Sequence, residues 1–191
     1  EIGVRLVGSE MCIRDREGLP AGFRPDMDRV AAFMARRAPG SGAWSTKRKE
    51  ADTPEILSGV VDGVLCGAPV SAVIHNSNQH SKDYEGLRRT PRPSHADYTA
   101  WVKYGESYDI RGGGQFSGRL TAPLCFAGAL ALQVLEQRGI TVAGHIAAIA
   151  GIQDEVPDFA RVDRESLLAL TGKPFPVFSD SAGADMVQAI E

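Results

Sequence analysis

The stretch RLTAPLCFAGALALQVLEQR, residues Arg119–Arg138, decides the fold of this chain. Its apolar side chains recur at helical spacing, at Leu120, Leu124, Ala127, Leu130, Ala131, Val134 and Leu135. The pattern predicts a helix from about Arg119 to Arg138, with Gly139 as its C-cap. Because this helix is apolar nearly all round, we expect it to be buried between layers of other structure.

Shorter elements flank this helix on both sides. The sequence predicts a helix capped by Asp26 and running to 37, one over 95–104, one that starts at Asp163 and runs to 170, and one that starts at Ser179 or Asp180 and runs to 191. It predicts strands over 55–61, 68–75 and 140–149. Asp62-Gly63 and Gly67 supply turns for a hairpin between the first two strands. Ser94 is expected to cap the helix over 95–104, with Asp97 three residues on in a capping-box arrangement.

Residues 1–16 do not resemble the rest of the chain, since they show no sustained period and no clear turn chemistry. The run MCIRDR at Met11–Arg16 is what one reading frame of a common sequencing-library adapter encodes. We therefore predict that residues 1–16 are an artefact and not part of the fold. Glu191 carries no sign of a natural ending, so we expect the chain to be a fragment at both ends.

Composition excludes several broad classes. The net charge of −3 argues against a general nucleic-acid binder. The charge is uneven, with 12 Lys/Arg against 9 Asp/Glu over 36–119 and 4 against 9 over 120–191, so the first region could face an anion. No window approaches the ~20 apolar residues of a membrane span. The three cysteines predict buried, reduced thiols in a cytoplasmic protein.

The stretch Arg92–Arg119 carries the candidate chemistry. His95 follows Arg92 by three residues and precedes a predicted helix, and both influences favour the neutral imidazole. A neutral histidine that touches solvent can take or give a proton near neutral pH. The alternative is a histidine that only caps its own helix, and the residues alone leave both readings open.

The run RGGGQFSGR at Arg111–Arg119 could wrap a phosphate or the edge of a ring, because glycines let the backbone approach a ligand closely. It matches neither a Walker A loop nor a dinucleotide fingerprint. The alternative is a tight turn that serves packing alone.

A basic cluster lies upstream, at Arg36, Arg37, Lys47, Arg48 and Lys49. It is either a solvated face or a clamp for a small phosphorylated or carboxylated substrate. His75, His80 and Asp83 lack zinc-like spacing, and we predict no metal site.

Five ordered blocks resemble the chorismate synthase family. They are ARRAPGSGAWSTKRKEAD (Ala35–Asp52), EILSGVVDG (Glu55–Gly63), GAPVSAVIHNSNQHSKDY (Gly67–Tyr84), RPSHADYTAWVKYG (Arg92–Gly105) and RGGGQFSGRLTA (Arg111–Ala122). The resemblance implies an α+β fold, a β-α-β sandwich of antiparallel sheets with helices packed between, here incomplete. Residues 17–191 would be the N-terminal portion of one such domain, which in the family assembles as a homotetramer.

The resemblance also implies a reaction, the 1,4-anti elimination of phosphate from 5-enolpyruvylshikimate 3-phosphate to give chorismate. Reduced FMN is required although there is no net redox change, and NADPH is a possible reductant. The rival interpretation is a non-catalytic flavin- or anion-binding module. Neither interpretation involves nucleic acid or a membrane.

Site residues follow from the resemblance position by position. His95 matches a catalytic histidine that protonates the reduced flavin or balances its charge. Arg92, Arg119 and Arg48 match substrate-binding positions. Four further positions match cofactor-binding residues: Arg37, for a nicotinamide nucleotide or substrate, and Gln115, Phe116 and Ser117, for the flavin.

Departures from the family pattern concern both catalysis and binding. The GESHG motif with the family's first catalytic histidine is absent, and residues 1–16 stand in its place. Ala43 replaces an arginine, Ser94 replaces a glycine, and Gln-Phe-Ser at 115–117 replaces the usual Arg-Ser-Ser. We therefore expect this chain alone to be inactive.

Overall fold

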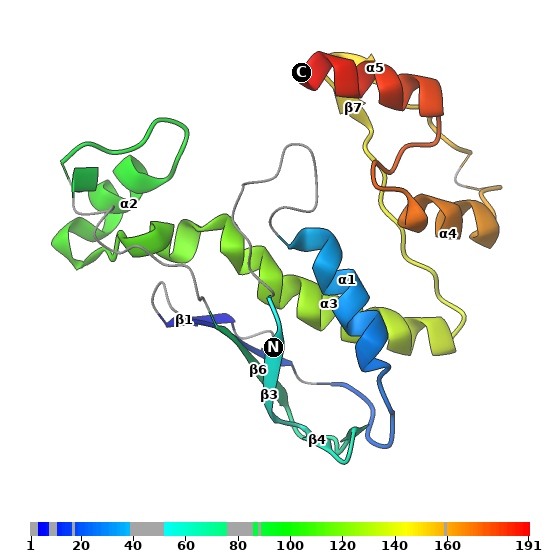
Figure 1. Ribbon diagram of the computed structural model, residues 1–191, viewed down its shortest axis with the longest axis horizontal. Helices are drawn as coiled ribbons and strands as arrows, with labels where there is room; N and C mark the ends of the chain where they lie inside the picture. Colours follow the sequence, from blue (N-terminus) through cyan, green and yellow to red (C-terminus); the bar gives the residue numbers. More distant parts are fainter. Residues whose placement is uncertain are drawn as a thin grey trace. The chain divides into compact units, whose positions relative to one another are not determined.

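The computed structural model describes residues 4–7, 11–16, 18–38, 52–75, 86–87, 89–158 and 160–191, and for 4–7, 11–16, 111 and 112 it describes the backbone. The chain divides into two compact units, Glu1–Val134 and Leu135–Glu191. The first unit holds a four-stranded sheet with two long helices (Figure 1). Helices with small antiparallel sheets make this an α+β fold, as the sequence predicted.

The sheet of the first unit has the order β1-β2-β6-β3, with every neighbouring pair antiparallel. Its strands are β1 (Val4–Val7), β2 (Met11–Arg16), β3 (Pro54–Ser58) and β6 (Val70–His75). Val70, Ala72 and Ile74 alternate along β6 and are buried in one core, which fits the two-residue period of a strand. The predicted pairing of 55–61 with 68–75 is confirmed for 54–58 with 71–74, with a register shift between Ile56 and Ser58, whereas 60–61 pair elsewhere.

A second, smaller ladder extends this hairpin. β4 (Val60–Val61) pairs with β5 (Val64–Leu65), a strand that the sequence did not predict. Asp62 and Gly63 form the turn between them, both at positive φ. The sequence therefore predicted the turn correctly but not the short strand that follows it.

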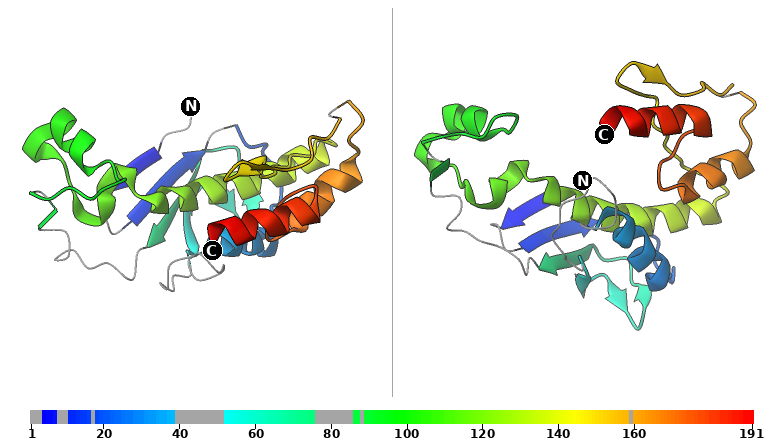
Figure 2. Two further views of the ribbon diagram at one scale, coloured as in Figure 1. Left: turned by 90° about the horizontal axis from the view of Figure 1, so that it is seen from above. Right: turned by 45° about the horizontal axis from the view of Figure 1, so that its top comes forward.

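Two helices cover one face of the sheet, α1 (Met27–Arg37) and α3 (Thr121–Gln137) (Figures 1 and 2). The Asp26 side chain caps α1, as predicted, by accepting hydrogen bonds from the backbone N–H groups of Asp28 and Arg29. The Gln133 amide of α3 pairs with both backbone groups of Asp26, at 2.8 and 3.0 Å. This pair of hydrogen bonds fixes the start of α1 against α3.

The long apolar helix is buried on one side. Ala122, Phe126 and Leu130 lie in the core with α1 and β6, whereas Leu124 is 51% exposed. By length and composition alone, Gly118–Gln137 could cross a membrane, which corrects the expectation that no window approaches that size. A core helix of a soluble protein meets the same criterion.

Residues 4–7 and 11–16 are strands of this sheet, and β2 pairs with β6 from Met11 opposite His75 to Arg16 opposite Val70. The structure thus includes residues that the sequence placed outside the fold. Pairing does not report where a sequence came from, because backbone hydrogen bonds form with almost any side chain. The artefactual origin of residues 1–16 stays a prediction.

The second unit contains β7 (Ala148–Ile149), β8 (Ile152–Gln153), α4 (Arg164–Gly172) and α5 (Asp180–Ile190). Asp163 and Ser179 cap the two helices with their side chains, as predicted. The predicted strand over 140–149 is wrong for 140–147, where no strand forms. Ile146 instead donates its N–H to the carbonyl of Pro176, at 2.8 Å.

The described cysteines differ in exposure. Cys66 is exposed, which corrects the expectation of burial, and Cys125 is partly buried in α3. Burial raises the pKa of the Cys125 thiol. Both are free thiols.

Candidate functional site

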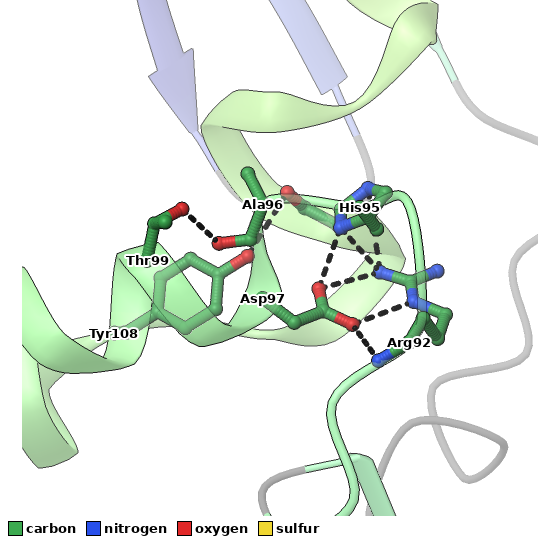
Figure 3. Close-up of polar contacts among 7 residues, drawn as sticks. Arg92, His95, Ala96, Asp97, Thr99 and Tyr108 are labelled. Carbon is green, nitrogen blue, oxygen red and sulfur yellow. Dashed lines mark hydrogen bonds and ion pairs between the residues drawn. The ribbon is translucent and has the colours of Figure 1, made fainter.

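A buried aspartate, Asp97, binds both Arg92 and His95, two of the candidate residues from the sequence. The Asp97 carboxylate lies between the Arg92 guanidinium and the His95 imidazole (Figure 3). Arg92 donates to it from its backbone N–H at 3.0 Å, from Nε at 2.8 Å and from its NH2 nitrogen at 2.9 Å. Nδ1 of His95 lies 2.6 Å from Oδ1 of Asp97. We call these three residues the Asp97 cluster.

The electrostatics of the Asp97 cluster favour an ionised carboxylate. Hydrogen bonds from the Arg92 guanidinium outweigh the effect of burial and hold the pKa of Asp97 well below its usual range. The Asp97 side chain has no exposed surface, whereas those of Arg92 and His95 are 32% and 26% exposed. Solvent therefore reaches the cation and the imidazole but not the anion that holds them.

The local fold explains why Asp97 takes this role and corrects the predicted cap. Helix α2 (Asp97–Tyr104) starts two residues later than expected, and its N-cap Ala96 makes no side-chain hydrogen bond. Ser94 lies at φ 60°, in the left-handed region. This bend turns the chain so that Asp97 faces back toward Arg92, and the carboxylate binds the side chains ahead of the helix.

The glycine run lies directly against His95. It forms a 3₁₀ segment, η3 (Arg111–Phe116), in which Gly113 is buried at φ +83°. A Cβ at Gly113 would lie 3.1 Å from Nε2 of His95, tighter than side chains normally pack. The Tyr108 hydroxyl donates to the Gly113 carbonyl at 3.3 Å and fixes this peptide. At Gly113 the structure therefore has the tight turn with close backbone packing, the second of the two interpretations, and ligand binding by the run stays a prediction.

The three predicted flavin-contacting residues follow this turn. Gln115 and Phe116 are exposed, and the Phe116 ring lies 6.0 Å from the Tyr108 ring. The Ser117 hydroxyl accepts the backbone N–H of Arg119 at 3.3 Å and caps the short 3₁₀ turn η4 (Gly118–Leu120). Two of the three side chains are thus open to a ligand, and the third positions Arg119.

A second buried aspartate, Asp52, holds two predicted anion-binding arginines. The Arg37 guanidinium bonds directly to the Asp52 carboxylate, whose side chain has no exposed surface. Arg119 approaches the same carboxylate at 3.7 Å and donates to the backbone carbonyl of His75 at 2.9 Å. Arg37 also donates to the Thr121 hydroxyl at 3.0 Å. We call Arg37, Asp52 and Arg119 the Asp52 cluster.

The two clusters are close neighbours along the chain. Gly113, which packs against His95 of the Asp97 cluster, and Arg119 of the Asp52 cluster differ by six positions, so their Cα atoms lie no more than about 20 Å apart even if the link were fully extended. Two 3₁₀ segments in that link make the path shorter. The predicted site residues His95, Arg92, Gln115, Phe116, Ser117, Arg119 and Arg37 all belong to this region, whereas Arg48 lies outside the described residues.

Sequence reasoning missed Asp52 and treated Asp97 only as a helix cap. The sequence did contain one signal for Asp97, because this carboxylate lies only a few residues from Arg92 and His95. Such spacing is also common on solvated surfaces, so it does not identify a site by itself. Burial of the carboxylate, which makes the contact consequential, depends on tertiary packing.

Among the residues that the structure describes, no three His, Cys, Asp or Glu side chains gather as metal ligands would. His75 pairs with Glu55 at 3.0 Å, and both side chains are well exposed. His80 and Asp83, the other two residues considered for a metal, lie outside the described residues.

Comparison with known proteins gives one family. The family model of chorismate synthase matches residues 11–191. A chorismate synthase from Lancefieldella parvula is 50% identical over 139 residues, 72% of this chain and 36% of the relative. One from Burkholderia mallei is 42% identical over 170 residues, 88% of this chain and 45% of the relative.

A solved structure agrees on the fold. A crystal structure of chorismate synthase superposes with a TM-score of 0.63 at 20% identity, covering 99% of this chain and 51% of that one. At this identity the likeness bears on the fold alone. The chain spans about half the length of that structure, and less than half the length of the curated relatives above.

Proposed function

The chain belongs to the chorismate synthase family, and we propose that the complete protein eliminates phosphate from 5-enolpyruvylshikimate 3-phosphate to give chorismate. The proposed reaction is a 1,4-anti elimination that requires reduced FMN. In it a C–O bond to phosphate and a C–H bond break, so the site must stabilise a departing anion and manage a proton. This reaction belongs to the biosynthesis of aromatic compounds through shikimate.

One observation carries the proposal, the burial of Asp97 between Arg92 and His95 beside the glycine run. The arrangement supplies a half-buried imidazole for proton transfer and a half-buried guanidinium for an anion, both held by hydrogen bonds. Both groups are oriented before any ligand arrives, which is the condition under which electrostatic stabilisation is most effective.

We assign substrate binding to Arg92, Arg119 and Arg48, because the substrate carries two carboxylates and a phosphate. The Asp52 carboxylate reduces the positive charge of this region. Arg37 and Arg119 share this one buried anion, so the three side chains together carry about one net positive charge. Such a shared anion keeps two guanidinium groups close to each other without mutual repulsion. The substrate then meets oriented guanidinium groups rather than flexible ones.

The residues of η3 fit one wall of a flavin site. The exposed Phe116 ring offers a stacking surface, and the exposed Gln115 amide can donate and accept hydrogen bonds. Reduced FMN, when bound, would supply electron density that eases the departure of phosphate. Arg37 is our candidate for contact with a nicotinamide nucleotide, NADPH, if flavin reduction is intrinsic.

This chain by itself is proposed to be inactive, because it spans less than half of its relatives and lacks the GESHG histidine. We propose a cytoplasmic homotetramer for the complete protein.

An anaerobic assay of phosphate release with reduced FMN tests the function. A complete protein that contains residues 17–191 of this sequence and an intact GESHG motif should release phosphate from 5-enolpyruvylshikimate 3-phosphate, and the 191-residue chain should not. His95→Gln should lower the rate on the order of a hundredfold or more, the usual contribution of a general acid or base. His75→Gln is the matched control, since it removes an exposed imidazole and keeps the carbonyl that Arg119 uses.

Flavin titration separates this function from the rival, a binding module without catalysis. The complete enzyme should bind reduced FMN more tightly when substrate is present, because both ligands share one site. Equal flavin affinity with and without substrate, together with no phosphate release, would favour the module.

A further inference from the structure

The two ring nitrogens of His95 face different surroundings. Nδ1 lies 2.6 Å from Oδ1 of Asp97, within a short hydrogen bond. Nε2 lies on the Gly113 side, where an added Cβ would come within 3.1 Å of it. A side chain at position 113 would therefore crowd this nitrogen, and the positive φ of Gly113 also favours glycine.

The state of Asp97 determines which nitrogen carries the fixed hydrogen. Three donor groups of Arg92 bond to the carboxylate and keep it ionised, so Asp97 can only accept. The hydrogen in the contact between Nδ1 and Oδ1 must then belong to Nδ1. In the neutral ring the lone pair is at Nε2.

The guanidinium of Arg92, which also lies near the His95 ring, does not change which ring nitrogen carries the hydrogen. Its NH2 nitrogen lies 3.2 Å from Nδ1 and 3.4 Å from Nε2. A guanidinium has no acceptor, so it cannot take the hydrogen of Nδ1. It can only donate toward Nε2, at a distance where hydrogen bonds are weak.

We propose that Asp97 is a positioning residue that fixes His95 as the Nδ1–H tautomer, so that proton exchange takes place at Nε2, the nitrogen that Asp97 does not bind. Asp97 itself stays ionised throughout, since it is buried and bonded to Arg92. The proposal rests on the proposed function only for the identity of the molecule that exchanges the proton.

Nitrogen-15 NMR of the histidine-labelled 191-residue chain tests the tautomer directly, because a protonated and an unprotonated ring nitrogen differ widely in chemical shift. The chain has four histidines, and loss of a signal in His95→Gln assigns the resonance. In the unsubstituted chain we expect Nδ1–H to exceed Nε2–H roughly tenfold or more, as a hydrogen bond to a charged acceptor implies. A predominantly Nε2–H ring would overturn the proposal.

Asp97→Asn supplies the second arm. An asparagine amide can donate to Nδ1, so the tautomer ratio of His95 should fall at least tenfold, while Asp154→Asn should leave it unchanged. An unchanged ratio in a folded Asp97→Asn chain, judged by an unchanged signal of His75 in the same unit, would contradict the proposal. If that variant does not fold, the tautomer of the unsubstituted chain still decides.

Chemical modification tests the role of Gly113. Diethyl pyrocarbonate attacks an unprotonated ring nitrogen, so we expect modification of His95 at Nε2, slowed several-fold by Gly113→Ala. Gly118→Ala is the control, since nothing lies within 4 Å of its added Cβ and its φ is not positive. Modification at Nδ1, or equal rates in both variants, would overturn this part. Neither measurement uses flavin or substrate, so a failed elimination assay would leave its outcome unaffected.

Discussion

Among the residues that the structure describes, two histidine–aspartate pairs occur, and they differ in what surrounds them. In both, an aspartate with no exposed side-chain surface accepts from a histidine Nδ1, at 2.6 Å for His95–Asp97 and 3.1 Å for His145–Asp154. Asp97 also accepts hydrogen bonds from the guanidinium and the backbone N–H of Arg92. Asp154 instead accepts from the backbone N–H groups of Phe178 and Ser179.

The two histidine rings also differ in what lies on the side away from the aspartate. Nε2 of His95 lies beside a glycine, whereas the His145 ring packs edge-on against the Phe178 ring at 5.0 Å. The second pair joins the segment before β7 to the start of α5 and so reads as a structural tie. A histidine–aspartate pair is therefore a candidate for chemistry only where the remaining contacts leave charge and space.

The largest expected difference between the pairs is catalytic. In a complete protein, Asp97→Asn should lower the rate of phosphate release on the order of a hundredfold, up to the loss in His95→Gln, because Asp97 acts through that histidine. Asp154→Asn should change it only a few-fold. Steady-state kinetics with reduced FMN measures both, and similar losses in the two variants would mean that the pairs do not differ in function.

Removal of Asp154 should instead affect stability. Asp154→Ala leaves the backbone N–H groups of Phe178 and Ser179 without their carboxylate and should destabilise the second unit by about 2–4 kcal/mol. Urea unfolding followed by NMR signals from α5 measures this. Asp185→Ala, at an exposed position on the same helix, is the control and should change stability by less than about 0.5 kcal/mol.

Acid should weaken both pairs. Burial alone would raise the pKa of Asp154, but hydrogen bonds from Ser179, Phe178 and His145 lower it, and Arg92 lowers the pKa of Asp97. A lowered pKa in the folded state contributes stability above the unfolded pKa of about 3.9, and this contribution is lost as pH falls toward the folded value.

Each carboxylate should therefore cost up to about 1.4 kcal/mol per pH unit below pH 4. Urea midpoints between pH 5 and pH 2, read from NMR signals of each unit, measure the loss. Asp97→Asn should make the urea midpoint of the first unit less dependent on pH and leave the second unit unchanged. Asp154→Asn should do the same to the second unit alone. If both variants flattened the same unit, the two pairs would not act independently.

The smallest expected effect concerns a glycine near each histidine. Gly113→Ala should destabilise the first unit by about 1 kcal/mol, because alanine disfavours a φ of +83° and its Cβ would crowd His95. Gly144, next to His145, has nothing within 4 Å of an added Cβ, so Gly144→Ala should be neutral or slightly stabilising. Thermal unfolding of the two variants compares their stability. Equal destabilisation would mean that position 113 has no greater need for glycine than position 144.

Local signals predicted much of the fold. Asp26, Asp163 and Ser179 cap helices where the sequence placed the caps, and the apolar period located α3 to within two residues at its start. Caps and periods are contained in a few neighbouring residues, so they can be read without knowing the tertiary structure. The failed strand over 140–147 has apolar residues in sequence but no strand partner in the structure, because strands depend on distant neighbours.

The sequence by itself determined the family resemblance, the helical layer and the choice of His95, Arg92 and the glycine run as the candidate reactive stretch. Only the tertiary structure decided what holds them, since it buried Asp97 and Asp52 among the arginines and set Gly113 against Nε2 of His95. The reason is physical. Residue type and spacing fix which groups are available, but burial sets the strength of a charge–charge contact and which nitrogen of an imidazole remains open.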